Sequence, residues 1–376
     1  MIYLDNNATT PILPEVYEAM EPYLTTEWGN PSSSYKFGSK LKGVIEKARG
    51  EVADLIGANA SEIIFTSCAT ESNNAAINAA LKANPEKRHI VTSAVEHSSV
   101  LNFCMALEKE GYRVTYLPVD REGLLNLEDL KTAITDETAI VSLMWANNET
   151  GVLFPVKEIG DICKERNVLF HCDAVQAAGK IEIDMKKVKA DYLSLTGHKF
   201  GAPKGIGALY IRRKTPYIPL IYGGHQERNK RGGTENVAFI VGLGIAVTIA
   251  IRHLPDYEKK VRELRDELEE GILTTIQNTE LNGHKKLRLS NTTNISFHGI
   301  ESEALLILLD KEGICASSGS ACLANSDEAS HVVKAMKLTS TKTQNMIRFS
   351  LSYLNNKDDI PLVKNNIIHN VAILNT

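Results

Sequence analysis

The chain has 376 residues, of which 43% are hydrophobic and 23% charged, and these values are ordinary for a globular protein. A chain of this length is expected to hold roughly two to three domains with a large buried core. Its formal net charge of -4 argues against a protein dedicated to nucleic acid or to an anionic membrane, because such proteins carry a basic excess.

Three features predict a cytoplasmic protein with reduced thiols. The first residues, Met1 to Asp5, lack the basic and apolar regions of a signal peptide. The longest apolar run, residues 237–251, falls short of the roughly twenty residues that a bilayer requires, so we expect a buried helix there. The cysteines are too scattered for a compact disulfide framework; they are Cys68, Cys104, Cys163, Cys172, Cys315 and Cys322.

Short β-branched runs alternate with longer helical patterns over the first two-thirds of the chain. This alternation predicts a mainly parallel sheet covered by helices on both faces, and such sheets bind ligands beyond the carboxyl ends of their strands. The expected strands are residues 63–66, 89–92, 114–117, 139–144, 168–171, 191–195 and 206–211. The expected helices between them are residues 72–82, 100–110, 127–134 and 156–165.

The last third has a mixed α+β pattern, which predicts a smaller second domain with a boundary near Pro255. The expected elements are a charged helix (257–275), a strand (294–297), a helix (302–312), a strand (346–351) and a closing helix (360–374).

Polar residues follow several of the expected strands. Ser67 to Ser72 open a helix, where backbone N–H groups and a hydroxyl suit a phosphate, although an ordinary helix cap by Thr70 is the simpler interpretation. His97 suits acid–base chemistry or stacking on a bound ring, but a histidine at a helix start often has no role. Asn147 and Asn148 precede a glycine and are typical of a turn.

Two charged residues end neighbouring strands. Asp173 ends a buried strand, and an acid at that depth needs a set of hydrogen bonds or a cationic partner such as a protonated pyridine nitrogen. Lys199 lies between a strand and a glycine-rich loop, which suits Schiff-base chemistry with an aldehyde. Considered alone, Lys199 fits a lysine on a surface turn equally well.

Residues 315–325 form a loop of small residues with two cysteines. Cys322 lies among small polar residues, as a reactive cysteine does, whereas Cys315 adjoins Ile314 and fits core packing. No CxxC pair or HxxxH run is present, so we expect no metal site.

Taken together, these residues resemble the cysteine desulfurases of the NifS/IscS type, which are pyridoxal-phosphate enzymes of the class-V aminotransferase family. The resemblance covers essentially the whole chain and is carried by residues 3–11, 29–33, 69–74, 147–151, 196–199 and 231–234, by the Cys322 loop and by residues 347–350. It implies the type I fold of pyridoxal-phosphate-dependent transferases. In that fold, residues 16–254 would form a large domain with a mainly parallel seven-stranded sheet. Residues 1–15 and 255–376 would form a smaller α+β domain with a mobile catalytic loop at about 316–332.

The resemblance also implies a role for individual residues. Lys199 would hold pyridoxal phosphate and remove a proton, Asp173 would pair with the ring nitrogen, and Gln176 would hydrogen-bond the phenolic oxygen. His97 would stack on the ring and exchange protons. The phosphate would be held by Ala69, Thr70, Thr196 and His198, with Thr234 supplied by the partner subunit of a homodimer. Asn148, beside the cofactor, and Arg348 would bind the substrate carboxylate.

The implied reaction converts L-cysteine to L-alanine and leaves the sulfur as a persulfide on Cys322, from which a sulfur-acceptor protein of unknown identity takes it. Iron–sulfur cluster assembly, tRNA thiolation and DNA phosphorothioation all draw on this family. Selenocysteine lyase activity or another β-elimination is the alternative within enzymes. A non-catalytic partner scaffold is the alternative of another class.

Overall fold

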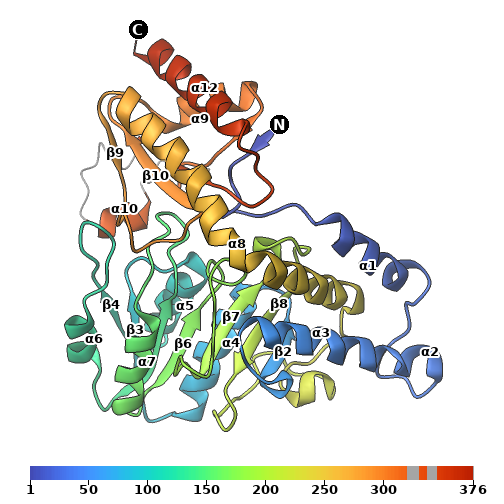
Figure 1. The fold of residues 1–376 in the computed structure, drawn as a ribbon. Coiled ribbons are helices and arrows are strands. Elements are labelled where there is room, and N and C mark those ends of the chain that lie inside the picture. Colours follow the sequence, from blue (N-terminus) through green and yellow to red (C-terminus); the bar gives the residue numbers. More distant parts are fainter. Residues whose placement is uncertain (320–329, 337–344, 376) are drawn as a thin grey trace.

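The computed structural model describes residues 1–319, 330–336 and 345–375. The molecule has a broad part built around one large sheet and a smaller part above it, and the N-terminal strand and C-terminal helix both lie in the smaller part (Figure 1). An arm projects to one side and contains helices α1 (Pro14–Thr25) and α2 (Lys36–Ser39).

The large sheet has seven strands in the order β2-β8-β7-β6-β5-β3-β4. Strand β8 is antiparallel to both of its neighbours, and every other neighbouring pair is parallel. The prediction of a mainly parallel seven-stranded sheet is therefore confirmed. Its strands are β2 (Ile63–Thr66), β3 (His89–Ser93), β4 (Arg113–Leu117), β5 (Thr138–Met144), β6 (Leu169–Asp173), β7 (Tyr192–Thr196) and β8 (Gly207–Ile211).

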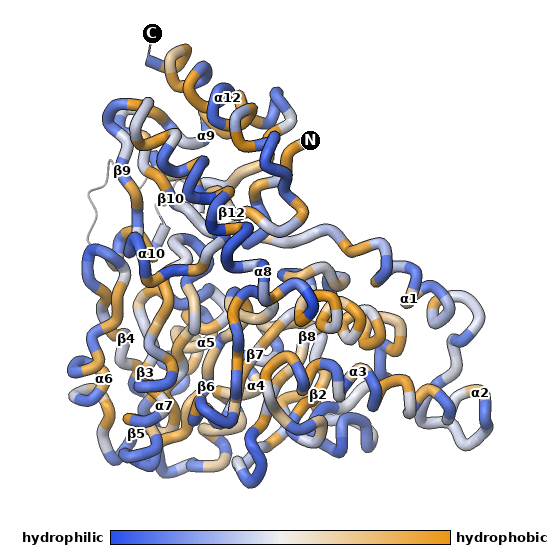
Figure 2. The backbone as a smooth tube through the Cα atoms, in the orientation of Figure 1, coloured by the Kyte–Doolittle hydropathy of each residue, from blue (hydrophilic) through white to orange (hydrophobic). Residues whose placement is uncertain are grey.

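The strands are apolar on both faces, which is why helices cover both sides of the sheet. Ile64 and Ile90 pack in the hydrophobic cluster that includes α4 and α5. Their successors Phe65 and Val91 pack on the opposite face, in the cluster that includes α3, α7 and α8. Side chains alternate along a strand, so both faces must be buried, and the apolar strands lie inside the fold (Figure 2). The helices are α3 (Leu41–Leu55), α4 (Ala69–Ala83), α5 (Ser98–Lys109), α6 (Leu127–Ala133) and α7 (Val156–Glu165).

The smaller part contains a three-stranded antiparallel sheet in the order β12-β10-β9 and a short parallel pair of β1 with β11. The pairing of β1 brings the start of the chain against strand residues more than three hundred positions later. The elements are β1 (Ile2–Tyr3), β9 (Thr279–Leu281), β10 (Thr292–Phe297), β11 (Ile314–Cys315), β12 (Met346–Ser350), α9 (Ser302–Lys311), α10 (His331–Ala335) and α12 (Asp359–Leu374). The α+β character predicted for this region is confirmed.

Helix α8 (Val237–Thr275) is a single helix of 39 residues that joins the two parts (Figure 1). The sequence predicted separate helices at residues 237–251 and 257–275, and the structure corrects this. Pro255 removes one main-chain hydrogen bond, but the helix continues because one half packs on α1 and α3 and the other on α12.

By length and composition, α8 is also the one described helix that could cross a membrane, but 56% of its most apolar 18-residue window is buried within the protein. The prediction of a buried helix at residues 237–251 is confirmed, because this half of α8 belongs to the core beneath the sheet.

The hydrophobic core divides into separate clusters along α8. The cluster of the large part runs from Leu13 to Ala250 and adds Val332 and Met336, whereas the cluster of the smaller part joins Leu4 to side chains between residues 257 and 371. This division is compatible with domains at 16–254 and at 1–15 with 255–376, whose limits stay a prediction.

A buried ion pair anchors the turn that follows the large sheet. Nη1 of Arg49 on α3 lies 2.6 Å from Oε2 of Glu227, and its Nη2 donates to Oε1 at 2.9 Å. The main-chain N–H of Phe65 also donates to Oε2, at 2.8 Å. Glu227, Arg228 and Asn229 have φ of 47°, 57° and 65°, a left-handed run that costs free energy and needs such an anchor.

We therefore expect Glu227→Ala to lower the free energy of unfolding by about 3–5 kcal/mol, because it leaves a buried guanidinium without its main partner. Urea unfolding measures this loss. Glu137→Ala is the matched control: it breaks an ion pair with Arg113 in which the glutamate side chain is 72% exposed, and it should change stability by no more than about 1 kcal/mol. Equal effects of the two substitutions would contradict the anchoring role.

Candidate active site

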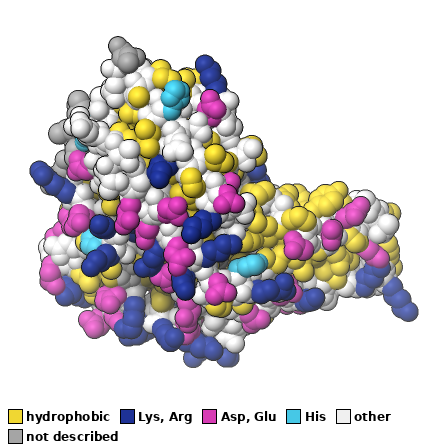
Figure 3. Space-filling model, turned by 45° about the horizontal axis from the view of Figure 1, so that its top comes forward, with side chains coloured by type: hydrophobic (Ala, Val, Ile, Leu, Met, Phe, Trp, Pro, Cys, Tyr) yellow, Lys and Arg dark blue, Asp and Glu magenta, His cyan; other side chains and the backbone are white. Residues whose placement is uncertain are grey.

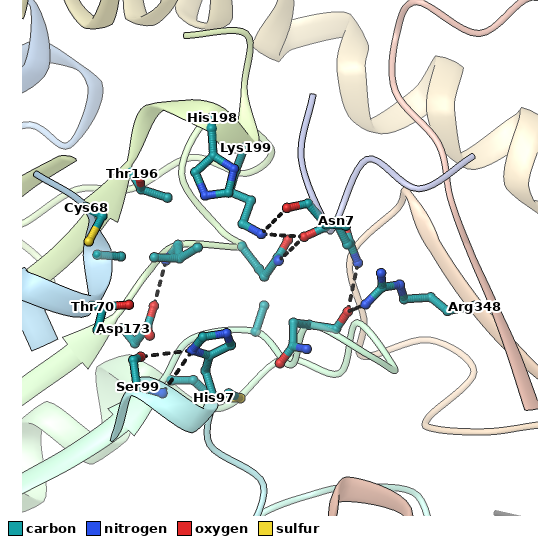
Figure 4. Close-up of a pocket in the computed structure, with 17 residues that line it drawn as sticks. Asn7, Cys68, Thr70, His97, Ser99, Asp173, Thr196, His198, Lys199 and Arg348 are labelled. Atoms are coloured by element: carbon teal, nitrogen blue, oxygen red, sulfur yellow. Dashed lines mark hydrogen bonds between the residues drawn. The ribbon is translucent and has the colours of Figure 1, made fainter. Parts of the chain in front are cut away.

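A cavity of about 270 Å³ lies at the carboxyl ends of strands β5, β6 and β7 (Figure 4). Segments far apart in the sequence meet there, among them the N-terminal segment, the starts of α4 and α5, and β12. Most of the predicted site residues line it, namely Ala69, Thr70, His97, Asn148, Asp173, Gln176, Thr196, His198, Lys199 and Arg348. Cys322 lies outside the described residues.

Lys199 ends the short 3₁₀ helix η2 (Gly197–Lys199), directly after β7. Its Nζ donates to the main-chain oxygens of Asn7 and Ala8, at 2.6 and 2.8 Å. Both acceptors belong to the N-terminal segment, so this segment positions the amine at the cavity wall. The arrangement does not fit a lysine on a surface turn, which was the simpler interpretation of the sequence.

Asp173 ends β6 and is only 5% exposed. Its carboxylate accepts hydrogen bonds from Nδ2 of Asn73, at 2.8 Å, and from the main-chain N–H of Val175, at 3.0 Å. Both donors are neutral, so they hold the carboxylate without neutralising its charge. A cation that enters the cavity would meet an oriented negative group.

A chain of hydrogen bonds links Asp173 to His97. Asn73 also donates to Oγ of Ser99, at 2.9 Å, and Oγ of Ser99 lies 2.9 Å from Nδ1 of His97. The main-chain N–H of Ser99 donates to the same Nδ1, at 3.1 Å. Because Nδ1 accepts this bond, the neutral imidazole carries its proton on Nε2.

Burial lowers the pKa of His97, with Lys199 and His331 acting in the same direction and Asp173 opposing them. Burial also lowers the pKa of His198 to about 4, again aided by the nearby lysines. Both imidazoles are therefore neutral at physiological pH. His97 can offer its Nε2–H to a bound group.

Ala69 and Thr70 begin helix α4 and line the cavity, and the N–H groups of a first helical turn have no acceptor within the helix. The residue before them, Cys68, makes no side-chain capping bond. The interpretation of Thr70 as an ordinary cap is wrong, because the helix begins earlier than the sequence predicted and Thr70 lies within its first turn. An uncapped helix start at a cavity wall suits an anionic group.

Thr196 and His198 complete this wall from the β7 side. The hydroxyl of Thr196 donates to the main-chain oxygen of Ile206, at 3.0 Å, and Nδ1 of His198 lies 3.2 Å from Oγ1 of Thr9. Both side chains are fixed by the protein and line the cavity beside Lys199.

Arg348 lies on β12 and is 1% exposed. Its Nη1 donates to the main-chain oxygen of Asn148, at 3.0 Å, and its Nη2 pairs with Oδ1 of Asp5, at 2.5 Å. Among the described residues, nothing accepts a hydrogen bond from its buried Nε. Arg348 lines the cavity, and its guanidinium suits a carboxylate there.

Thr234 does not line this cavity. It is exposed beside a separate hollow that includes Glu227, Arg231 and Asn236. Thr234 and the phosphate-site candidates of its own chain therefore line different hollows.

Several residues that shape the site had no predicted role. Asn7 and Asp5 lie in the segment 3–11 that carries part of the family resemblance, but they reach Lys199 and Arg348 only through the tertiary fold. Asn73 is different: it follows Ala69 by four positions on α4, so the helical period places it on the same face and could have indicated it.

Comparison with known proteins agrees with this architecture. The class-V aminotransferase model matches residues 2–363. Cysteine desulfurase 2 of Trichormus variabilis is 56% identical over 363 residues, which is 96% of this chain and 91% of that protein. A solved NifS-like protein is 37% identical with a TM-score of 0.93 and covers 99% of both chains. A solved structure of SspA in complex with cysteine is also 37% identical, with a TM-score of 0.83 over 94% of this chain and 99% of that one.

The chain belongs to the class-V aminotransferase family, and its fold is that of the NifS-like cysteine desulfurases. The predicted resemblance to desulfurases of the NifS/IscS type is confirmed. Its relatives are named as enzymes, which removes the support for a non-catalytic scaffold.

The environment of His97 yields a prediction for the protein without added ligand. Nitrogen NMR of histidine-labelled protein should show a neutral His97 ring protonated on Nε2, with a titration midpoint below the ordinary value of about 6.5, because burial disfavours the cation. Ser99→Ala should weaken the preference for this tautomer. A midpoint above the ordinary value would contradict the described environment.

Proposed function

We propose that this chain is an L-cysteine desulfurase that uses pyridoxal 5'-phosphate to convert L-cysteine to L-alanine and transfers the sulfur through Cys322. The observation that carries the proposal is the cavity at the strand ends, where Lys199, Asp173, His97 and Arg348 meet. Membership of the class-V aminotransferase family, whose enzymes depend on pyridoxal phosphate, supports the choice of cofactor.

The residues of the cavity fit this cofactor. The uncapped first turn of α4, with Ala69 and Thr70, suits its phosphate, and Thr196 and His198 flank the same wall. The oriented carboxylate of Asp173 suits a protonated ring nitrogen. When bound, the cofactor supplies an electron sink for the bonds around the substrate's Cα.

Side chains of the protein perform the proton transfers in this proposal. The amine of Lys199 is the base that removes the proton from Cα once it no longer holds the cofactor. His97 lies over the same cavity and, with its proton on Nε2, donates to or accepts from the reacting groups.

Cysteine is bound through its carboxylate. Arg348 lines the cavity, which supports this role, and Asp5 and the carbonyl of Asn148 fix the orientation of its guanidinium. Arginine binds a carboxylate with fixed geometry, which orients the substrate. SspA, a solved relative, is in complex with cysteine.

Cys322 is the proposed sulfur carrier. Its thiolate attacks the sulfur of the bound cysteine, so that an S–S bond forms while the substrate's Cβ–S bond breaks. The carbon fragment keeps the electron pair, gains a proton and leaves as alanine, and the persulfide stays on Cys322 for an acceptor protein.

The assembly is proposed to be a homodimer with shared sites. The exposure of Thr234, away from the cavity of its own chain, supports its contact with the partner's phosphate site. Hydrophobic side chains gather over the projecting arm (Figure 3). Large exposed apolar residues of the arm are Tyr17, Leu24, Trp28 and Tyr35, and such a surface is typical of an interface.

The cytoplasm is the proposed location, and iron–sulfur cluster assembly, tRNA thiolation and DNA phosphorothioation are the candidate destinations of the sulfur. Free thiols agree with a reducing compartment; among the described residues these are Cys68, Cys104, Cys163, Cys172 and Cys315.

The proposed sulfur carrier is tested by Cys322→Ser. The variant should keep the visible absorbance of the lysine-bound cofactor but lose the protein persulfide and at least about a hundredfold of its desulfurase rate, because the nucleophile is gone. Alanine production and persulfide labelling measure the two losses. Full sulfide release by the variant would instead indicate a β-elimination or a selenocysteine lyase type of reaction.

The shared site is tested with Thr234→Ala, which should weaken cofactor binding about tenfold through the loss of one hydrogen bond to a charged group. Mixed dimers of Thr234→Ala and Lys199→Ala subunits should regain one intact site. No recovery on mixing, together with dimers confirmed by sedimentation, would contradict the exchange of Thr234 between subunits.

A further inference from the structure

Lys180 is a buried lysine that has no role in the proposed reaction. It is 3% exposed and lies between β6 and β7, behind the cavity wall. Its Nζ donates to Oε1 of Gln176, at 2.7 Å, and to Oδ1 of Asn7, at 3.0 Å. A lysine is rarely buried without a reason, since its ammonium loses hydration there.

The hydrogen bonds around Gln176 fix which end of its amide is which. Lys180 donates from its Nζ in either protonation state, and the atom of Gln176 that lies beside it is the amide oxygen. A main-chain carbonyl only accepts, so the atom 3.0 Å from the oxygen of Asn7 is the amide nitrogen. The amide therefore cannot rotate by half a turn without losing both bonds. Its NH2 group has a second hydrogen, and Gln176 lines the cavity.

Asn7 is fixed in the same way. Its Oδ1 accepts from Lys180 and from Nδ2 of Asn291, at 3.0 Å each, while its Nδ2 donates to the main-chain oxygen of Asn148, at 3.2 Å. The main-chain oxygen of this same residue receives Lys199. Lys180 thus holds both Gln176 and Asn7, whose main-chain oxygen accepts from the reactive amine of Lys199.

We propose that Lys180 is a positioning residue that locks the amide of Gln176 with its NH2 group toward the cavity, so that the site presents a donor to the cofactor's phenolic oxygen. This inference rests on the proposed function. A donor at that position favours the deprotonated phenolic oxygen and competes with the Schiff-base proton for it. Without Lys180, only the bond to the main-chain oxygen of Asn7 opposes rotation of the amide, and a rotated amide would present its oxygen instead.

The charges around Lys180 agree with this role. Burial lowers the pKa of Lys180 well below its ordinary value, and Lys199 and Arg348 act in the same direction. The two partners of Lys180 are amide oxygens, so its amine serves to orient neutral groups.

The test is an absorbance titration of cofactor-loaded Lys180→Met. The pKa of the bound chromophore should rise by about one unit or more, because the phenolic oxygen loses its donor. Gln176→Leu should give the same rise, and the double variant should rise no further, since both substitutions remove one interaction. Lys187→Met is the matched control on an exposed lysine (69% side-chain exposure) and should titrate like the wild type.

An unshifted pKa in Lys180→Met, or shifts that add in the double variant, would overturn the inference. If the wild type itself binds no cofactor, the proposed function fails instead. Should Lys180→Met not fold, Gln176→Glu tests the same contact: the lysine would hold one carboxylate oxygen and leave an acceptor in the cavity. Cofactor affinity measured by equilibrium dialysis should then fall at least about tenfold, and unchanged affinity would overturn the inference.

Discussion

The active site depends on one contact, in which the main-chain oxygens of Asn7 and Ala8 hold the amine of Lys199. Other hydrogen bonds hold the segment that supplies these oxygens. Nδ2 of Asn7 donates to Oγ1 of Thr292, and the main-chain N–H of Asn7 donates to Oγ of Ser350. Since these partners belong to β10 and β12 of the smaller part, the lysine of the large sheet is positioned by the rest of the molecule. The site forms only when both parts are folded together.

A second constraint on the site is that neutral side chains surround its few charged groups. Asn73 and Ser99 connect Asp173 to His97 without adding charge, and burial keeps the imidazole neutral. The carboxylate therefore stays available for a cation, and the polarity of the site is set before any ligand binds. Hydrogen bonds thus preorganise the site, and such bonds are stronger inside a protein than in water.

Much of the fold could be predicted because the signals were local. The strands of the large sheet are short apolar runs between helical patterns, and each was found within a few residues of its bounds. Local rules failed at Pro255, where packing on both halves of α8 outweighs the lost hydrogen bond, and at Thr70, where the cavity leaves the helix start uncapped. The contacts of Asn7 and Asp5 join positions more than a hundred residues apart, so no spacing in the sequence contains them.

The most direct test of the account is to find the residue that carries the cofactor. The wild-type protein is loaded with pyridoxal phosphate, reduced with borohydride and digested, and the modified lysine is identified by tandem mass spectrometry. The account predicts a stable cofactor adduct on Lys199 alone. An adduct on Lys180 or on another lysine, or no adduct at all, would contradict it.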